Sequence, residues 1–85
     1  MQKIKKFHFG ETYVNNKKSM CYDLIYRKDM YLIFSVHKKN GREMYKCVAT
    51  SIFKADEKGA FEQVITSRGD IVRSDKIVSS KKMAA

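Results

Sequence analysis

The sequence predicts a small all-β domain, an antiparallel meander of five to six strands that forms a strongly curved sheet or a small barrel. Apolar and polar residues alternate with a period of two from Lys3 to about Val72, and no window with helical spacing competes with this pattern. Asn40-Gly41, flanked by two long alternating runs, is a strong hairpin signal. The remaining turn signals divide the chain into short strands.

The length is typical of one domain, because 85 residues form a single core of modest size. We expect residues 1–78 to form the β domain and residues 79–85, which are small, polar and basic, to form a flexible tail. Folding of so short a chain hides only roughly 60–65% of its unfolded surface, so we expect modest stability.

The charge is strongly basic. The chain has 18 Lys and Arg residues against nine Asp and Glu residues, a formal net charge of +9. Such an excess favours polyanions as partners, either nucleic acid or an acidic protein surface.

Several site classes find no support in the composition. Two cysteines without a Cys-x-x-Cys pair, together with two histidines, argue against a zinc site, and we predict no other metal or cofactor. No apolar run approaches the roughly 18 residues of a membrane span, and the charged N-terminus lacks the apolar segment of a signal peptide. We therefore expect a cytoplasmic protein with reduced thiols and no membrane partner.

The first two strands are predicted at residues 3–14 and 19–26. Asn15-Asn16-Lys17-Lys18 is a polar turn cluster between them, and Gly10 marks a bulge or bend in the first strand.

The third strand is predicted at residues 30–37, and side-chain parity selects the turn that precedes it. A two-residue loop at Lys28-Asp29 would place Asp23 opposite Phe34, whereas a three-residue loop at residues 27–29 keeps apolar residues opposite one another. We predict the three-residue loop, with Asp29 in the left-handed conformation. It pairs Tyr26 with Met30, Leu24 with Leu32 and Tyr22 with Phe34.

The fourth strand follows the Asn40-Gly41 turn, for which we predict a two-residue type I′ loop. Cys21 and Cys47 then point to different faces, which argues against a disulfide between them. The predicted pairs are Lys39 with Arg42, Lys38 with Glu43, Val36 with Tyr45, Phe34 with Cys47, and Leu32 with Ala49.

Two more strands complete the meander. A five-residue loop at 55–59 leads to a fifth strand at 60–66, which pairs Phe53 with Phe61 and Ala49 with Ile65. A turn at 67–70 leads to a short sixth strand at 71–73. Residues 74–78 are compatible either with a strand or with a short C-terminal helix capped by Ser74 or Asp75.

The aromatic residues indicate which face is the core. Strand parity places nine of the ten on one face and leaves Tyr31 on the other. The outer strands of an open meander expose unpaired backbone, so a homodimer through a strand edge is plausible.

The turns sort the charge by end of the sheet. Alternate turns of a meander lie at the same end, so the turns at 15–18, 38–42 and 67–70 share one edge. This edge is predicted to gather Lys17, Lys18, Lys38, Lys39, Arg42 and Arg68 against Asp70. Clustered cations of this kind suit phosphates, because they release counterions together. The alternative to a binding function is that these turns are only solvated, and that their lysines discourage mispairing of the neighbouring strands.

Two further residues extend the predicted interface. Tyr31 is the best candidate for an exposed ring that stacks on a base, and Lys46 lies near it on the same face.

Three functions remain open, led by a non-enzymatic protein that binds nucleic acid through the basic edge. The rival is an inhibitor or adaptor of the kind that phages and mobile elements encode, which would occupy an acidic surface of a protein, for example a nucleic-acid-handling or defence complex. The third is a small toxin-like ribonuclease. It would use His37, Tyr45, Lys46 and Arg42, which are common residue types and a weak signal.

Overall fold

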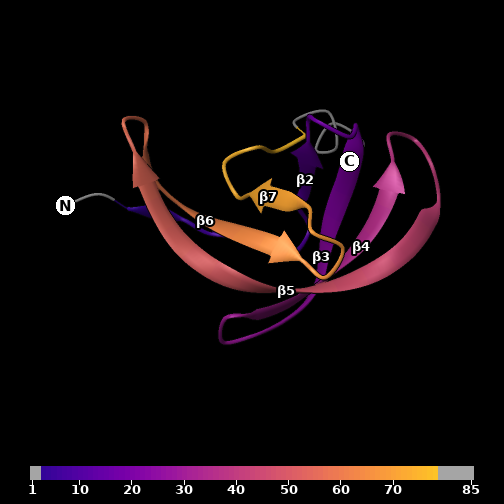
Figure 1. Ribbon diagram of the computed structural model, residues 1–85, viewed down its shortest axis with the longest axis horizontal. Coiled ribbons are helices and arrows are strands. Elements are labelled where there is room, and N and C mark those ends of the chain that lie inside the picture. Colours follow the sequence, from indigo (N-terminus) through magenta and orange to yellow (C-terminus); the bar gives the residue numbers. More distant parts are fainter. Residues whose placement is uncertain (1–2, 79–85) are drawn as a thin grey trace.

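The computed structural model describes residues 3–78 and confirms an all-β fold, without a helix in that range. Seven strands form one strongly curled sheet, a half-barrel (Figure 1). Their bounds are β1 Ile4–Lys5, β2 Thr12–Asn15, β3 Met20–Lys28, β4 Tyr31–Lys38, β5 Glu43–Asp56, β6 Gly59–Thr66 and β7 Ile71–Arg73.

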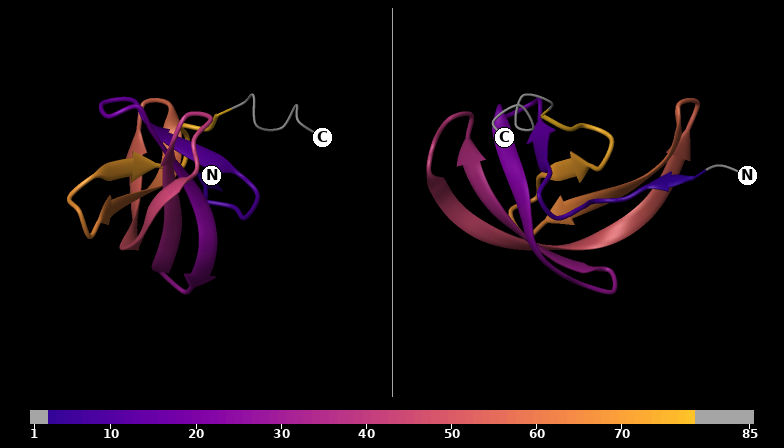
Figure 2. Two further views of the ribbon diagram at one scale, coloured as in Figure 1. Left: turned by 90° about the vertical axis from the view of Figure 1, so that its right-hand side faces the viewer. Right: turned by 180° about the vertical axis from the view of Figure 1, so that it is seen from behind.

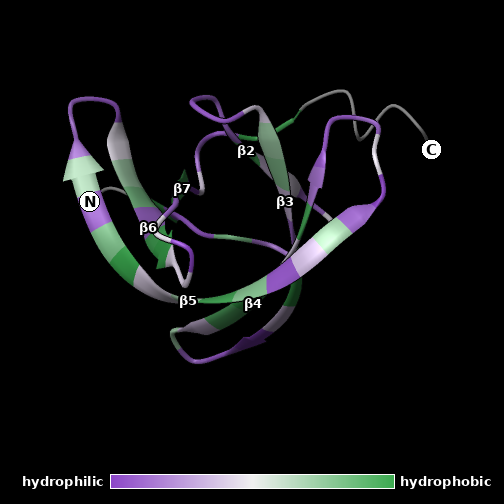
Figure 3. Ribbon diagram, turned by 45° about the vertical axis from the view of Figure 1, so that its right-hand side comes forward, coloured by the Kyte–Doolittle hydropathy of each residue, from purple (hydrophilic) through white to green (hydrophobic). Residues whose placement is uncertain are grey.

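The sheet is organised around β5, the longest strand. The strand order is β1-β6-β5-β4-β3-β2. β7 pairs with the same edge of β6 as β1 does, further along that strand. The first part of β5 pairs with β4, up to Thr50 opposite Tyr31, and the last part pairs with β6, from Ala49 opposite Thr66. Because β5 pairs with β4 along its first part and with β6 along its last part, the twist of this strand curls the sheet around an interior. Buried and exposed residues alternate along the middle of β5, from Cys47 to Ser51, as expected for a strand with one buried face. The hydropathy of the strand changes in short hydrophobic and hydrophilic stretches (Figure 3).

The predicted first strand is wrong in one respect, because residues 3–14 form two strands. The chain breaks near Gly10, whose φ is +86°. Before the break β1 pairs in parallel with β6, with Ile4 opposite Ala60, and after it β2 pairs antiparallel with β3. The break lets the N-terminal segment leave one side of the curl and join the other.

Residues 74–78 form neither a helix nor a full strand. Ile77 makes an isolated antiparallel bridge with Tyr13, and the backbone N–H of Val78 donates to the carbonyl of Thr12 at 2.8 Å. This segment follows β7 and covers the outer edge of β2 (Figure 2), so one expected open edge is occupied. The predicted tail at 79–85 lies outside the described residues.

The predicted three-residue loop between β3 and β4 is wrong. The loop has two residues, with Lys28 opposite Tyr31, and the register shifts between Leu24 and Tyr26. The bulge at Ile25 adds one residue to β3, so the core side of the hairpin keeps its apolar parity despite the shorter loop. Leu24 therefore lies opposite Phe34 rather than Leu32. Asp29 has a φ of +56°, as predicted.

The hairpin between β4 and β5 confirms most of its predicted register. The pairs of Val36 with Tyr45, Phe34 with Cys47 and Leu32 with Ala49 are all present. The type I′ turn is wrong, because Asn40 has a φ of +64° while Gly41 keeps a negative one. A register shift after Val36 places His37, rather than Lys38, opposite Glu43.

The turn between β5 and β6 is tighter than predicted. Asp56 lies opposite Gly59, which leaves a two-residue turn in place of a five-residue loop. The register therefore moves by one residue, so that Phe53 faces Glu62 and Lys54 faces Phe61. This slip moves Phe61 to the outer face of the sheet. The sixth predicted strand matches β7.

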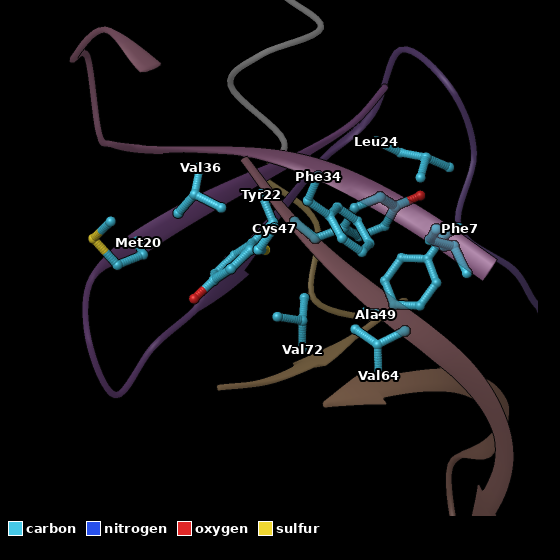
Figure 4. Packing of buried hydrophobic residues seen from close by; sticks show 12 residues of the cluster. Phe7, Met20, Tyr22, Leu24, Phe34, Val36, Cys47, Ala49, Val64 and Val72 are labelled. Carbon is cyan, nitrogen blue, oxygen red and sulfur yellow. The ribbon is translucent and has the colours of Figure 1, made fainter. Parts of the chain in front are cut away.

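The core lies inside the curl (Figure 4). Phe7, Tyr13, Tyr22 and Phe34 meet edge to face, with ring centroids 4.8 Å apart for Phe7 and Tyr13 and 6.1 Å apart for Tyr22 and Phe34. Such contacts add to the stabilisation by buried area. The core cluster consists of Phe7, Tyr13, Met20, Tyr22, Leu24, Leu32, Phe34, Val36, Cys47, Ala49, Val64 and Val72.

The prediction that nine aromatic residues share the inner face is wrong for three of them. The bulge turns Tyr26 outward, where its ring centroid lies 6.5 Å from that of Tyr31. Phe61 lies on the outer face beneath the Arg73 guanidinium, and Phe9 is 61% exposed. Cys21 and Cys47 are both free thiols, as predicted.

Candidate functional site

Two turns, at residues 16–19 and 38–42, lie at one end of the half-barrel, and the turn at 67–70 lies lower, where the backbone N–H of Ser67 donates to the carbonyl of Val48 in β5. We call the residues of these three turns together the basic end. The turns after β2 and β4 stand at the same end in every view (Figures 1 and 2). The third turn reaches the first through an ion pair of 2.5 Å between Lys18 Nζ and Asp70 Oδ1. Two of the three turns whose common end was predicted from the meander thus lie together, and a side-chain contact connects the third turn to them.

The turn after β2 lies between two hollows. One, of about 520 Å³, separates it from Lys39 and from the segment that ends at Val78. The other, of about 180 Å³, lies between Lys17 and Lys18 on one side and Gly69 to Ile71 on the other. Both hollows are open to solvent and have cations on their walls.

Lys18 is not a free cation. Its partner Asp70 is only 5% exposed, accepts a hydrogen bond from the Tyr22 hydroxyl at 3.2 Å, and donates its own backbone N–H to Thr66 Oγ1. The hydrogen bond to Asp70 raises the pKa of Lys18. Lys18 therefore ties two turns together, and its charge is partly neutralised.

Arg68 lies over an aromatic ring. Its guanidinium carbon is 3.7 Å from the centroid of the Tyr45 ring, a cation–π contact. Tyr45 is half-buried on the inner face, so the contact orients Arg68 while its side chain stays exposed. The guanidinium keeps its donors available for an anion.

The other predicted cations of this end are exposed and unpaired. Within residues 3–78, Lys17, Lys38, Lys39 and Arg42 make no ion pair with a carboxylate. Asn15 shapes the first turn, because its side-chain oxygen accepts the backbone N–H of Lys17 at 3.1 Å.

Lys46 and Tyr31 lie elsewhere, on the outer face of the sheet. Lys46 is paired with Glu43 at 2.9 Å, and hydrogen bonds from Ser35 and then Lys46 lower the pKa of Glu43. Tyr31 is 47% exposed beside a shallow groove that includes Ser67. Because Ser67 belongs to the turn at 67–70 and precedes Arg68, the groove adjoins the basic end.

A hydrogen-bonded group around His37 is missing from the sequence prediction. His37 Nε2 lies 3.1 Å from Asp23 Oδ2, and the Thr12 hydroxyl donates to Asp23 Oδ1 at 2.6 Å. His37 Nδ1 lies 2.8 Å from the carbonyl oxygen of Lys38, so both ring nitrogens are engaged. The sequence signal was the shared outer parity of Asp23 and His37 on neighbouring strands.

The four residues of the ribonuclease hypothesis do not assemble on one face. Tyr45 lies on the inner face beneath Arg68, whereas His37 and Lys46 lie on the outer face. The geometry therefore offers no shared position for a scissile phosphate.

A second missed group is buried and structural. Glu62 is fully buried and accepts hydrogen bonds from Arg27, from the Ser51 hydroxyl at 2.6 Å and from the backbone N–H of Phe7 at 2.8 Å. Burial raises the pKa of Glu62, but these donors outweigh it and the net pKa is lowered. Its oxygens are satisfied within the protein, which leaves none for a ligand.

Other site types find no support in the described part of the chain. Residues 3–78 contain no group of three His, Cys, Asp or Glu side chains suited to a metal ion. The same residues contain no helix long and apolar enough to cross a membrane. Comparison of the chain with protein-family models, with curated proteins and with solved structures finds no match.

Proposed function

We propose that this protein binds nucleic acid, chiefly through phosphate contacts made by the basic end. The observation that carries the proposal is the group of exposed cations on two turns at one end and on the third turn, which Asp70 connects to them. Within residues 3–78, the carboxylate that lies among those turns, Asp70, is already occupied by Lys18. Anions therefore meet an uncompensated positive surface at this end.

A nucleic-acid backbone, which carries a series of phosphates, suits this surface better than a single small anion does. The cations belong to three separate turns around two hollows, so their spacing follows an extended ligand rather than a small one. Nothing in the arrangement reads base edges, since it has no long groove-filling element. The binding is thus expected to depend on the backbone and on salt.

The experiment measures the affinity of a labelled duplex and a labelled single strand at several salt concentrations. If roughly four to six phosphates are neutralised, the slope of log affinity against log salt on duplex DNA is about −4 to −5. The variant Lys38→Glu/Lys39→Glu/Arg42→Glu is expected to lose most of the affinity. The matched control Lys3→Glu/Lys5→Glu/Lys58→Glu changes the net charge equally, at residues outside the basic end, and is expected to lose much less.

Two results would contradict the proposal. Equal losses in the two triple variants would show a response to net charge alone. Failure of the wild-type protein to bind either nucleic acid, together with a protein partner that survives nuclease treatment of a pull-down, would favour the inhibitor or adaptor that binds an acidic protein surface.

A further inference from the structure

The outer face of the sheet carries an apolar groove that the basic end does not explain. It has a volume of about 270 Å³ and is formed by β4, β5 and β6. Its lining residues are Tyr31, Val48, Ala49, Thr50, Ile52, Ile65 and Ser67. Tyr31, Ile52 and Ile65 are 47%, 42% and 52% exposed, so this apolar surface faces solvent.

The ring of Tyr31 is held in place beside this groove. The Tyr26 ring meets it at an interplanar angle of 78°, an edge-to-face contact that covers at most one face of the Tyr31 ring. Tyr26 reaches this position only because the bulge at Ile25 turns it outward. An oriented aromatic ring with a free face is a stacking platform.

Cations border the groove on two sides. Lys28 lies opposite Tyr31 across the β3–β4 pair, and Lys54 follows Ile52 on the same face of β5. In the described chain neither is paired with a carboxylate, whereas the nearby Asp56 already binds Arg73 at 3.0 Å. The groove is therefore apolar at its centre and positive at its margins.

We propose that this groove holds one unpaired base stacked on Tyr31, with the flanking phosphates near Lys28 and Lys54. A base has apolar faces and polar edges, and Thr50 and Ser67 supply hydroxyls for those edges. A volume below the roughly 300–1,000 Å³ of pockets for drug-sized ligands suits one flat ring. A duplex does not fit this role, because its bases are stacked on one another.

The inference rests on the proposed function and adds a preference to it. Ser67 in the groove is followed by Arg68 of the basic end, so one strand that contacts the basic end continues over Tyr31. Phosphate contacts at the basic end serve duplex and single strand alike, whereas the groove serves only the single strand.

The experiment compares Tyr31→Ala, Tyr31→Phe and the control Phe9→Ala by anisotropy, with a labelled pyrimidine single strand and a labelled duplex of equal length. Phe9 is an exposed aromatic residue outside the groove. We expect Tyr31→Ala to weaken single-strand binding by roughly 5- to 100-fold and duplex binding by less than about twofold. Tyr31→Phe, which keeps the stacking ring, and Phe9→Ala are expected to bind both ligands like the wild type.

A second readout follows the ring itself. The sequence contains no tryptophan, so Tyr31→Trp introduces one reporter into the groove and Phe9→Trp introduces one outside it. Saturating single strand is expected to quench the emission of Tyr31→Trp and to leave that of Phe9→Trp unchanged.

The outcomes separate this inference from the proposed function. If the basic-end variant loses affinity but Tyr31→Ala binds the single strand normally, the groove inference is overturned and the proposed function survives. A wild-type dimer that Tyr31→Ala converts to monomers would also overturn it, since a second copy would then cover the groove. If neither nucleic acid binds to the wild type, both fail.

Discussion

Arg27 and Glu62 join opposite sides of the curled sheet through two hydrogen bonds of 2.7 and 2.5 Å, although 35 residues separate them. They lie on β3 and β6, which are not neighbours in the sheet. The bulge at Ile25 is what turns Arg27 inward, opposite Leu32, where it reaches the fully buried carboxylate. The pair thus holds the curl from inside.

Removal of one partner is expected to be costly. Arg27→Met leaves the buried Glu62 charge without its cation, so we expect a loss of about 3–5 kcal/mol in the free energy of unfolding. The double variant Arg27→Met/Glu62→Gln is expected to recover part of that loss, because a neutral amide still accepts the Phe7 N–H. Urea denaturation followed by circular dichroism measures both. Lys28→Met, an exposed neighbour, is the control and should cost less than about 0.5 kcal/mol; an equal loss there would contradict the assignment.

The same carboxylate makes stability depend on acid. The pKa of Glu62 is lower in the folded protein than the value of about 4.3 expected in the unfolded chain. The contribution of the ionised Glu62 to the free energy of unfolding is therefore fully present above the pKa of the unfolded chain. It is lost as the pH falls through the lower pKa of the folded protein. Urea midpoints measured from neutral pH down to acid should fall across that window. The pKa values of Asp56 and Asp75 are also lowered. The urea midpoint of the Glu62→Gln variant should therefore still fall with acid, but less steeply than that of the wild type. A variant whose pH profile equals that of the wild type would refute the prediction.

Release of Lys18 is expected to strengthen nucleic-acid binding at a cost in stability. Asp70→Asn removes the carboxylate that pairs with Lys18 and frees one cation at the basic end. The slope of log affinity against log salt should steepen by about 0.9, while the thermal midpoint falls. Glu57→Gln makes the same charge change at the exposed turn between β5 and β6. Were its slope to change as much, the effect would come from net charge and not from Lys18.

The Cys47 thiol is expected to react slowly in the folded protein. It is 4% exposed, and burial raises its pKa, with the charge of Asp70 adding to the effect. Because the thiolate is the reactive form, a Cys21→Ala variant that leaves Cys47 alone should react with a thiol reagent at least about tenfold more slowly when native than when denatured. Equal rates in the two states would show that the core opens there readily.

The alternation of residues along the chain determined much of this fold without tertiary information. The register of Phe34 with Cys47 follows from the hairpin signal at Asn40-Gly41, and the strand at Ile71–Arg73 follows from its flanking turns. The common end of the turns after β2 and β4 follows from the order of the hairpins. These features depend on neighbours in the sequence, so local patterns suffice to predict them.

Tertiary structure decided the features that a single residue can shift. The bulge at Ile25 and the one-residue slip that faces Phe53 with Glu62 cost little locally, and only packing inside the curl selects them. The parallel pairing of β1 with β6 and the ion pairs of Arg27 and Lys18 join segments far apart in the chain. No local pattern encodes such contacts, because their partners meet only once the sheet has closed around its core.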